Sequence, residues 1–473
     1  MQGRKQYSEK LFTSFQLSDR VPQDNFYRRL GSVLDLTWLY RATEKYYGAE
    51  GQSSIDPAVF FKLILIGYFE NLNSDRKIIN TTQLRMDLLF FLGYDIDEPL
   101  PWHSTLSRTR QLYGEEVFKE LFLQVLNQCV DKGMVAGRRQ AVDSFFTKAN
   151  ASMDSLAVQE VLQDGSLYAM SLKEDDEQSS SSGSINKIRR STTDSDARVS
   201  TKPGKPTQLN YLNQLSVDTA HHVITHIQAH HAGKRDSDCL EEVVENTADN
   251  LKTSGIEVEE ILADGNYCSG SSLQYLNDAD IKGYMPDPGQ YKAQRDGFTH
   301  HADEHYYQCS QGKKLLYKGT YPDRGGYLKK HYRSSVADCK NCPLKATCIQ
   351  GKGKIKKLAD TVDKPLYDQM HQRMKTAYGK RMKKIRQSTV EPVIGTPVNY
   401  HALRKVNTIG IKQANKCALG AAVAYNLKKL LNWTLCKIKA AVQAKVKKMK
   451  NLLQTPFFSM KHCVTPYPIK NLT

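Results

Sequence analysis

The sequence predicts an α/β protein in which an all-helical N-terminal domain precedes a core built on a mixed β-sheet. Capped helical segments fill the first 133 residues, and strand-like and helical segments alternate after them. The 473 residues, 40% of them hydrophobic, are enough for two or three domains with cores of their own.

The helical domain, residues 1–133, is punctuated by start and stop signals. Asp56-Pro57 supplies an N-cap and a first-turn proline before an apolar run, a second segment spans 74–92 and ends at Gly93, and a third runs from Glu115 to Gly133. Arg108 and Arg110 fall near a short helix that would suit a DNA-reading helix-turn-helix. Plain helical packing is the alternative.

The first part of the core, residues 134–285, has a strand at 139–146, a hairpin of two strands around Ala220-His221-His222, and a strand at 258–267. Helices are expected at 239–255 and 269–281. This order is the one expected for an RNase H-like mixed sheet. The polar segment 174–206, rich in Pro, Gly and Ser, is predicted to be a long mobile loop inserted after the first strand.

Cysteines are a feature of residues 286–359, a second segment that interrupts the core, between its sheet and its basic C-terminal helices. Four thiolates with this spacing can bind one tetrahedral zinc ion, and the alternative is a cluster of unliganded surface cysteines. The four are Cys309, Cys339, Cys342 and Cys348. Histidine-rich stretches at 221–231 and 299–307 also suggest metal, but a hairpin strand with histidines on one face is more often solvent-facing, which is our expectation here.

Positive charge is concentrated at the C-terminal end, in the last part of the core (360–435) and a basic tail (436–473). The segment 369–473 holds 21 Lys and Arg and a single acidic residue, Glu391. Such an excess favours a polyanion partner, nucleic acid first, although a solvated basic tail gives the same pattern.

Membrane and secreted proteins are poor matches to this sequence. The N-terminus lacks an apolar signal core, and Lys62 interrupts the longest apolar run, Val59 to Phe69. Ten cysteines in a long chain without a signal peptide indicate free thiols or metal ligands in a reducing compartment. We therefore expect a cytoplasmic protein.

Three carboxylates stand out by position. Asp143 lies within the first strand, Asp264 at the carboxyl end of a hydrophobic strand, and Glu391 inside the cationic segment. Magnesium prefers oxygen ligands, and two such ions would serve phosphodiester chemistry. Any one of these acids could instead be ordinary surface charge. Asp218, beside the hairpin turn, could be mistaken for a ligand, but aspartate is favoured there for turn hydrogen bonding.

Longer motifs surround these acids. VDSFFTKANAS contains Asp143, ILADGNYCSG contains Asp264, and RQSTVEPVIG contains Glu391 and is followed by HALRKVNTIGIKQANKCALGAAVAYNLKKLL. Together they resemble the transposases of bacterial insertion sequences that carry a DDE catalytic triad. The N-terminal segments SIDPAVFFKLILIGYFENLNSDRKI and LPWHSTLSRTR resemble the helical domain that precedes the catalytic core in that group, so the likeness spans most of the chain.

The resemblance implies that Asp143, Asp264 and Glu391 coordinate two magnesium ions, for which manganese would substitute, in an RNase H-like core. The family signature pairs Tyr378 with Arg381, but Glu391 follows Arg381 by ten positions instead of four. Pro392 disfavours α conformation at the residue before it, so we expect Glu391 at a helix junction or in a first turn. The cations expected to contact DNA are Arg108, Arg110, Arg381, Arg386, Arg404, Lys405 and Lys412.

The function predicted from the sequence is a DNA transposase that cleaves the ends of its element and joins the freed 3′-hydroxyl to target DNA, as a homodimer on DNA. A nuclease of the same fold that cuts without joining, and a DNA-binding protein descended from a transposase, are the alternatives.

Overall fold

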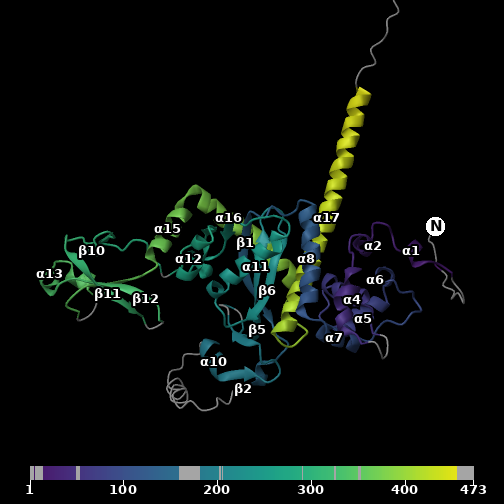
Figure 1. Cartoon of the computed structure of the whole chain (residues 1–473), viewed down its shortest axis with the longest axis horizontal. Coiled ribbons are helices and arrows are strands. Elements are labelled where there is room, and N and C mark those ends of the chain that lie inside the picture. The colour runs from purple at the N-terminus through teal and green to yellow at the C-terminus, as the bar shows by residue number, and fades with distance from the viewer. Residues whose placement is uncertain are drawn as a thin grey trace, which may run out of the picture. The chain divides into compact units, whose positions relative to one another are not determined.

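The computed structural model describes residue 5 and residues 14–48, 54–158, 182–201, 204, 206–289, 291–323, 326–349 and 353–454 (Figure 1). The chain divides into two compact units, Met1–Leu427 and Lys428–Thr473. Of the predicted basic tail 436–473, residues 436–454 belong to a helix and the rest lies outside the described residues. In the part of the chain that is described, no helix is long and apolar enough to cross a membrane.

The N-terminal region is helical, as predicted. Asp56 caps the central helix α4 by accepting hydrogen bonds from the Ala58 and Val59 amides, with Pro57 in the first turn. The segment predicted as one helix over 74–92 is divided in two at Leu84 and Arg85. The elements are α1 (Leu17–Arg20), α2 (Phe26–Gly31), α3 (Trp38–Thr43), η1 (Glu44–Tyr46), α4 (Pro57–Phe69), α5 (Asp75–Gln83), α6 (Met86–Leu92), α7 (His103–Leu112) and α8 (Glu115–Asp131).

A six-stranded mixed sheet forms the centre of the core, which confirms the predicted fold class. Strand β1 pairs antiparallel with β5 on one side and parallel with β7 on the other; β5 also pairs with β4 and β6, and β7 with β8. The strands are β1 (Arg139–Lys148), β4 (Arg198–Ser200), β5 (Gln208–Asp218), β6 (Ile224–His231), β7 (Glu260–Leu262) and β8 (Lys282–Tyr284).

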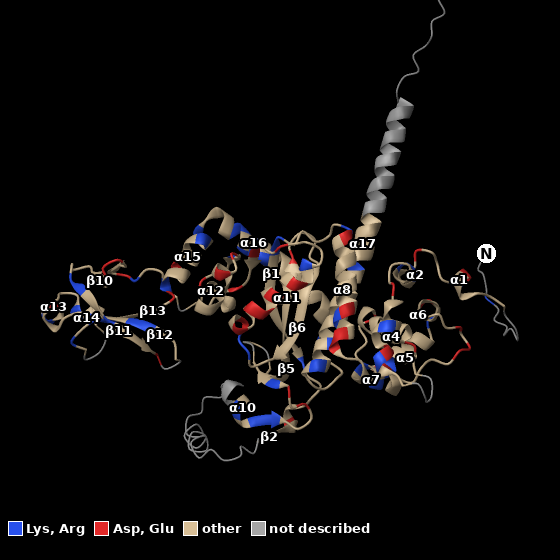
Figure 2. Cartoon of the chain, viewed as in Figure 1, with Lys and Arg blue, Asp and Glu red and all other residues tan. Residues whose placement is uncertain are grey.

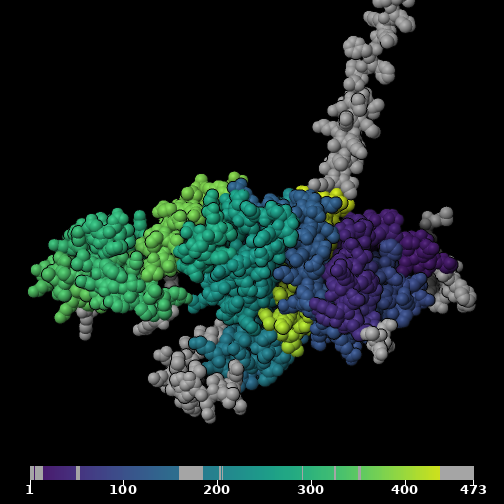
Figure 3. Space-filling model, in the orientation of Figure 1, coloured from purple at the N-terminus to yellow at the C-terminus, as the bar shows by residue number. Residues whose placement is uncertain are grey.

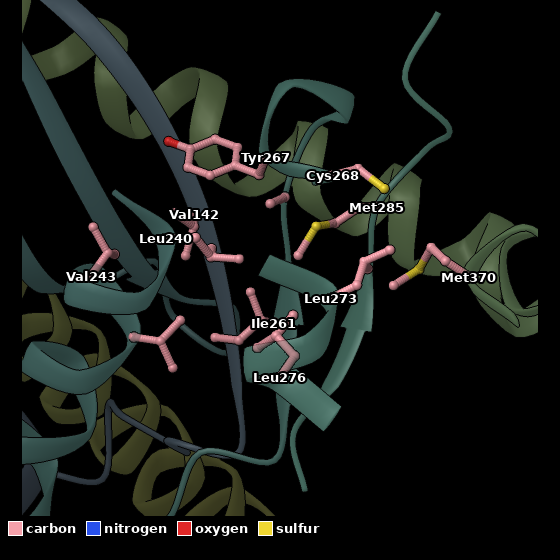
Figure 4. Packing of buried hydrophobic residues seen from close by; sticks show 12 residues of the cluster. Val142, Leu240, Val243, Ile261, Tyr267, Cys268, Leu273, Leu276, Met285 and Met370 are labelled. Atoms are coloured by element: carbon pink, nitrogen blue, oxygen red, sulfur yellow. The ribbon is translucent and has the colours of Figure 1, made fainter. Parts of the chain in front are cut away.

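Helices cover both faces of this sheet. The side chain of Val142 points to one face, where it packs with α11 (Leu240–Lys252), α12 (Gly270–Asp278) and Met370 of α15 (Lys364–Lys375) (Figure 4). Ala141 points to the other face, where it packs with Met382 and Val390 of α16 (Ala377–Tyr400). Because side chains alternate along a strand, Asp143 shares the α16 face with Ala141.

Strand β6 pairs with β5 on one side, and the helix α17 (Ile411–Gln454) covers its outer edge. The Asn426 side chain bonds both the amide and the carbonyl of Ile224, and Asn415 accepts from the Ala229 amide. The eleven steps from Asn415 to Asn426 rise about 16.5 Å along a helix, close to the ~17 Å that the five steps from Ile224 to Ala229 span in a strand. Two asparagines thus protect the strand edge, which would otherwise be free to pair with another chain.

The prediction of a long loop at 174–206 is wrong for the residues of this segment that the structure describes, because they form a helix and two strands. Residues 182–200 include α10 (Ser182–Ile188), β3 (Arg189–Ser191) and β4; β3 pairs with β2 (Leu156–Val158), which follows η2 (Met153–Ser155). Buried Asp194 orders the segment by accepting from the Tyr211 hydroxyl at 2.7 Å and from the Gly410 amide. The polar composition suggested a loop, but such long-range bonds cannot be recognised from composition. Residues 174–181 lie outside the described residues.

The predicted insertion contains a second sheet, antiparallel throughout. Its strands are β9 (Phe298–His301), β10 (Tyr306–Cys309), β11 (Lys314–Pro322), β12 (Leu328–Arg333) and β13 (Lys357–Thr361), in the spatial order 13-12-11-10-9. One face is a small core of Tyr307, Leu315, Tyr332 and Leu358. The short helices α13 (Val336–Lys340) and α14 (Lys345–Cys348) lie between β12 and β13 in the sequence.

Candidate active site

Asp143 and Asp264 are placed side by side by the pairing of two parallel strands. In β1 and β7, Arg139 is opposite Glu260 and Ala141 is opposite Leu262. The same register places Asp143 level with Asp264, two residues further on. Because side chains alternate, both carboxylates fall on the α16 face of the sheet.

Each aspartate has a carboxyl pKa above its ordinary value. Burial is the main cause for Asp143, and the charge of Asp264 adds to it. Burial is also the main cause for Asp264, with a contribution from the nearby charge of Asp236 in η3 (Asp236–Asp238). Two half-buried carboxylates with raised pKa values form a site that a bound cation would stabilise.

Arg386 of α16 is the cation that the structure places at this site. Its Nη1 lies 2.9 Å from Oδ2 of Asp143, in an ion pair with little exposure on either side. Its charge lowers the pKa of both aspartates, although burial outweighs it. Arg386 was expected to contact DNA; in this structure it holds Asp143.

The loop after β7 is fixed by a buried polar network that the sequence does not reveal. Asp264 accepts from the Asn266 amide at 2.9 Å, which starts the turn η4 (Gly265–Tyr267). Tyr267, fully buried, donates its hydroxyl proton to Gln214, and Gln214 donates to Asp236 at 3.0 Å. These residues come from three separate segments, so only the fold brings them together.

Glu391 lies in the middle of α16, not at the helix junction that Pro392 suggests. The helix continues through Pro392 and Pro397, each of which removes one backbone N–H. Val390 and Val393 on either side are fully buried, and Val390 packs on the sheet. Packing of this face therefore overrides the local preference of the residue before proline.

The structure does not gather Glu391 with the two aspartates. Glu391 is exposed and follows Arg386 by five residues, about 7.5 Å along a helix and about 140° around it. Across the described ranges, no group of three or more His, Cys, Asp or Glu is arranged to hold a metal ion. Two of the three predicted ligands thus form a pair, and the third stands apart on the same helix as Arg386.

Two family models match separate parts of the chain. A family model described as a transposase domain (DUF772) matches residues 15–112, and one described as a transposase DDE domain matches residues 308–431, which include Arg386 and Glu391. Two separate parts of the chain therefore match transposase domains, the second of them a DDE domain.

Solved structures of transposases are also similar to this one. The piggyBac transposase synaptic complex with hairpin DNA matches at 10% identity over 91% of this chain and 80% of that chain, with a TM-score of 0.31. Two Mos1 paired-end complexes, one with the left transposon end and one with Mn, match at 10% and 8% identity over 52% of this chain and 65% of theirs, with TM-scores of 0.17 and 0.16. No curated protein matches the chain.

Arg110, which was predicted to contact DNA, forms a buried ion pair with Asp75 in this structure. Its side chain is 6% exposed, and its two terminal nitrogens bond both oxygens of Asp75 at 3.0 and 2.7 Å. Buried Lys416 donates to the backbone carbonyls of Arg110 and Tyr113, which fixes the end of α7. Arg110 therefore has a structural role, and the ion pair occupies the groups that a phosphate would need.

The remaining predicted DNA contacts are surface cations. The exposed ones are Arg108, Arg381, Arg404, Lys405 and Lys412. The Arg404 guanidinium donates to Asn399 at 2.6 Å. Tyr378, expected to belong to the signature with Arg381, bonds Glu260 and Arg139 instead, at the start of the β1–β7 pair.

The metal sites suggested by cysteine and histidine are not formed in this structure. Cys309 lies on β10 and the other three cysteines on or beside α13 and α14, and no metal-holding group was found in the described residues. Zinc stays a prediction from the cysteine spacing alone.

Two histidines of the hairpin are not solvent-facing as expected. His226 and His230 are buried, beneath the helices that cover β6. Burial lowers the pKa of His226 to about 3 and lowers that of His230 as well. Asp218 has the turn role expected of it, since it accepts from the amides of Gly137 and Ala220 at 2.7 and 2.8 Å.

Proposed function

We propose that this protein is a transposase that cleaves DNA at the ends of its element and joins the freed 3′-hydroxyl to target DNA, with divalent magnesium bound by Asp143 and Asp264. The observation that carries the proposal is the pair of aspartates at one level of the sheet. DDE transposases as a family use divalent metals.

The donor set fits such a cation. Two carboxylates offer the oxygen ligands that magnesium prefers, and burial, which raises the pKa of each, removes water that would otherwise stabilise their charge. When bound, the metal supplies activation of the attacking oxygen and stabilisation of the leaving one. The chain's own part is to hold Asp143 through Arg386, and Asp264 through the buried Tyr267–Gln214–Asp236 network.

Glu391 is proposed as the third ligand, from its motif. Because it points away from the side of α16 that carries Arg386, reaching the aspartates requires a change in α16 when metal and DNA bind. Pro392 and Pro397 make this section of the helix the easiest to change, since two backbone hydrogen bonds are already missing.

The DNA partner follows from the surface charge and from the chemistry of the family. The exposed cations Arg381, Arg404, Lys405 and Lys412 are proposed to contact phosphates around the site, with Arg108 on α7 as a further contact. The homodimer on DNA rests on the family resemblance.

Purified protein, a labelled substrate carrying the terminal repeats that flank the gene, and magnesium test the proposal. Strand joining supports a transposase, cutting alone supports the nuclease, and binding alone supports a non-catalytic DNA-binding protein. Glu391→Gln is expected to abolish cleavage while leaving DNA binding within about twofold. Full cleavage by this variant would remove Glu391 from the site and leave the two aspartates in place. Lys384→Gln, at another exposed position of α16, is the matched control.

A further inference from the structure

One face of the insertion sheet is largely exposed among the residues that the structure describes, although Tyr306, paired opposite Leu316, is buried there. Side chains alternate along each strand, so the residues next to buried Leu315, Tyr332 and Leu358 point to the opposite face. The strand pairing aligns Leu316 with Arg333 and Arg333 with Lys357 on that face. We call it the open face.

Rings lie exposed on the open face. Tyr321 is 51% exposed, and its ring meets that of His331 edge to face at a centroid distance of 5.6 Å. The ring also lies across Gly319, where a Cβ would come within 2.7 Å of the Tyr321 hydroxyl. Leu316, half exposed, extends this apolar surface between the strands. Exposed rings and leucine on a sheet are unfavourable in water unless something covers them.

The charge around these rings is strongly positive. Residues 298–361 hold thirteen Lys and Arg against five Asp and Glu, and Figure 2 shows the blue of Lys and Arg along β12 and β13. On the open face, Asp323 pairs with Lys329 and Glu304 with Lys314. Within the described residues no ion pair engages exposed Arg333 or Lys357, so the pair of adjacent cations is available to an anion.

Rings and cations on one sheet face fit a nucleic acid whose bases are unstacked. Aromatic side chains stack on bases, and Lys or Arg beside them contact the phosphates. Duplex DNA would use the cations but would hide the faces of its bases from the rings. An acidic protein would likewise gain little from the rings. The segment that contains the insertion sheet is coloured green in Figure 3.

We propose that the open face of the insertion sheet binds single-stranded DNA, with bases stacked on Tyr321 and His331 and phosphates on Arg333 and Lys357. This rests on the proposed function, because cleavage and joining of DNA ends create unpaired strands. It adds a DNA contact outside the catalytic core and outside the C-terminal cationic segment.

Fluorescence anisotropy with the full-length protein tests the proposal. The probes are a labelled oligothymidine of about twelve nucleotides and a duplex of the same length. Tyr321→Leu combined with His331→Leu is expected to weaken single-strand binding by at least about fivefold and duplex binding by less than about twofold. Arg333→Gln combined with Lys357→Gln is expected to weaken both and to reduce their salt dependence. Lys340→Gln combined with Lys345→Gln, exposed on α13 and α14, is the matched control and should change neither.

The proposal would be overturned if the ring variant lost affinity equally for both probes or lost none for either. It would also be overturned if the wild-type protein did not bind the single strand. Photocrosslinking of an iodouracil-containing strand to the wild-type protein avoids any folding defect of the variants. The crosslinked peptide should come from residues 314–333; a crosslink elsewhere contradicts the proposal. Binding by Asp143→Asn protein should be unchanged, which separates this inference from the proposed catalysis.

Discussion

Two regions of the central sheet bury polar side chains in opposite ways. At the end of β7, Asp143 and Asp264 lie close together and have raised pKa values, and Arg386 forms an ion pair with Asp143. Along β6, Asn415 and Asn426 complete the hydrogen bonds of the strand edge, and His226 is held neutral by burial. Burial of polar groups therefore does not by itself mark a functional site. The aspartate pair differs in that its side chains are carboxylates whose charged form burial disfavours.

Of the variants in the two regions, Asp143→Asn is expected to have the largest effect on DNA cleavage. Loss of a metal-binding carboxylate should reduce DNA cleavage by a factor on the order of a thousand or more. Because a raised pKa means that the ionised carboxylate destabilises the fold at neutral pH, the variant should not unfold more easily than the wild type. Cleavage rates and urea unfolding of the same preparation check both halves. An inactive protein that is also clearly less stable would make Asp143 a structural residue.

Asn426→Ala is expected to give the reverse result. It leaves the buried amide and carbonyl of Ile224 without partners, which should lower the free energy of unfolding by about 3 kcal/mol. The folded fraction should keep the wild-type cleavage rate. Urea unfolding, with activity measured per folded molecule, distinguishes the outcomes. Asn432→Ala, an exposed asparagine further along α17, is the control.

The lowered pKa of His226 predicts how the free energy of unfolding depends on pH. The unfolded histidine has a pKa near 6.5 and the folded one about 3, so below pH 6.5 the unfolded state binds the proton more strongly. Stability should therefore fall as the pH drops from 6.5 towards 3, by about 2 kcal/mol at pH 5 from this group alone. His226→Gln should remove that part of the slope between pH 7 and pH 5. An unchanged slope would mean that His226 is accessible to water.

Arg386→Gln is expected to have the smallest effect, a shift in pH dependence. Arg386 lowers the pKa of Asp143, so its removal raises that pKa further. Cleavage should then be lost at a higher pH on the acidic side of the profile, while its rate above that range falls by less than about tenfold. A profile identical to that of the wild type would separate Arg386 from the site.

The fold class could be predicted from the sequence because it depends on short-range patterns, whereas Asp143 and Asp264 were singled out by their places in predicted strands and by the family resemblance. A hydrophobic strand ending in Asp264, and Asp143 within another, place the two carboxylates once the strands pair in parallel. The sequence does not reveal which strand residues the helices bury. His226 was expected to face solvent, because nothing in its own segment indicates that α17 covers β6.

The predictions for Glu391 and Arg110, both on helices, missed long-range contacts for a related reason. Pro392 has a local preference against helix at Glu391, but the buried face of α16 is stronger. Arg110 resembles a DNA contact in sequence, whereas its partner Asp75 is 35 residues away. Long-range ion pairs and packing decide both cases, and a local pattern contains neither.

Manganese binding by the DNA-free protein tests the central claim most directly. The wild type, Asp143→Asn and Asp264→Asn would be titrated with Mn²⁺ at neutral pH and followed by electron paramagnetic resonance, with Asp218 left intact in each. We expect the wild type to bind Mn²⁺ and either variant to lose at least about tenfold in affinity, because two adjacent carboxylates form the proposed site. Both variants binding Mn²⁺ as tightly as the wild type would contradict it.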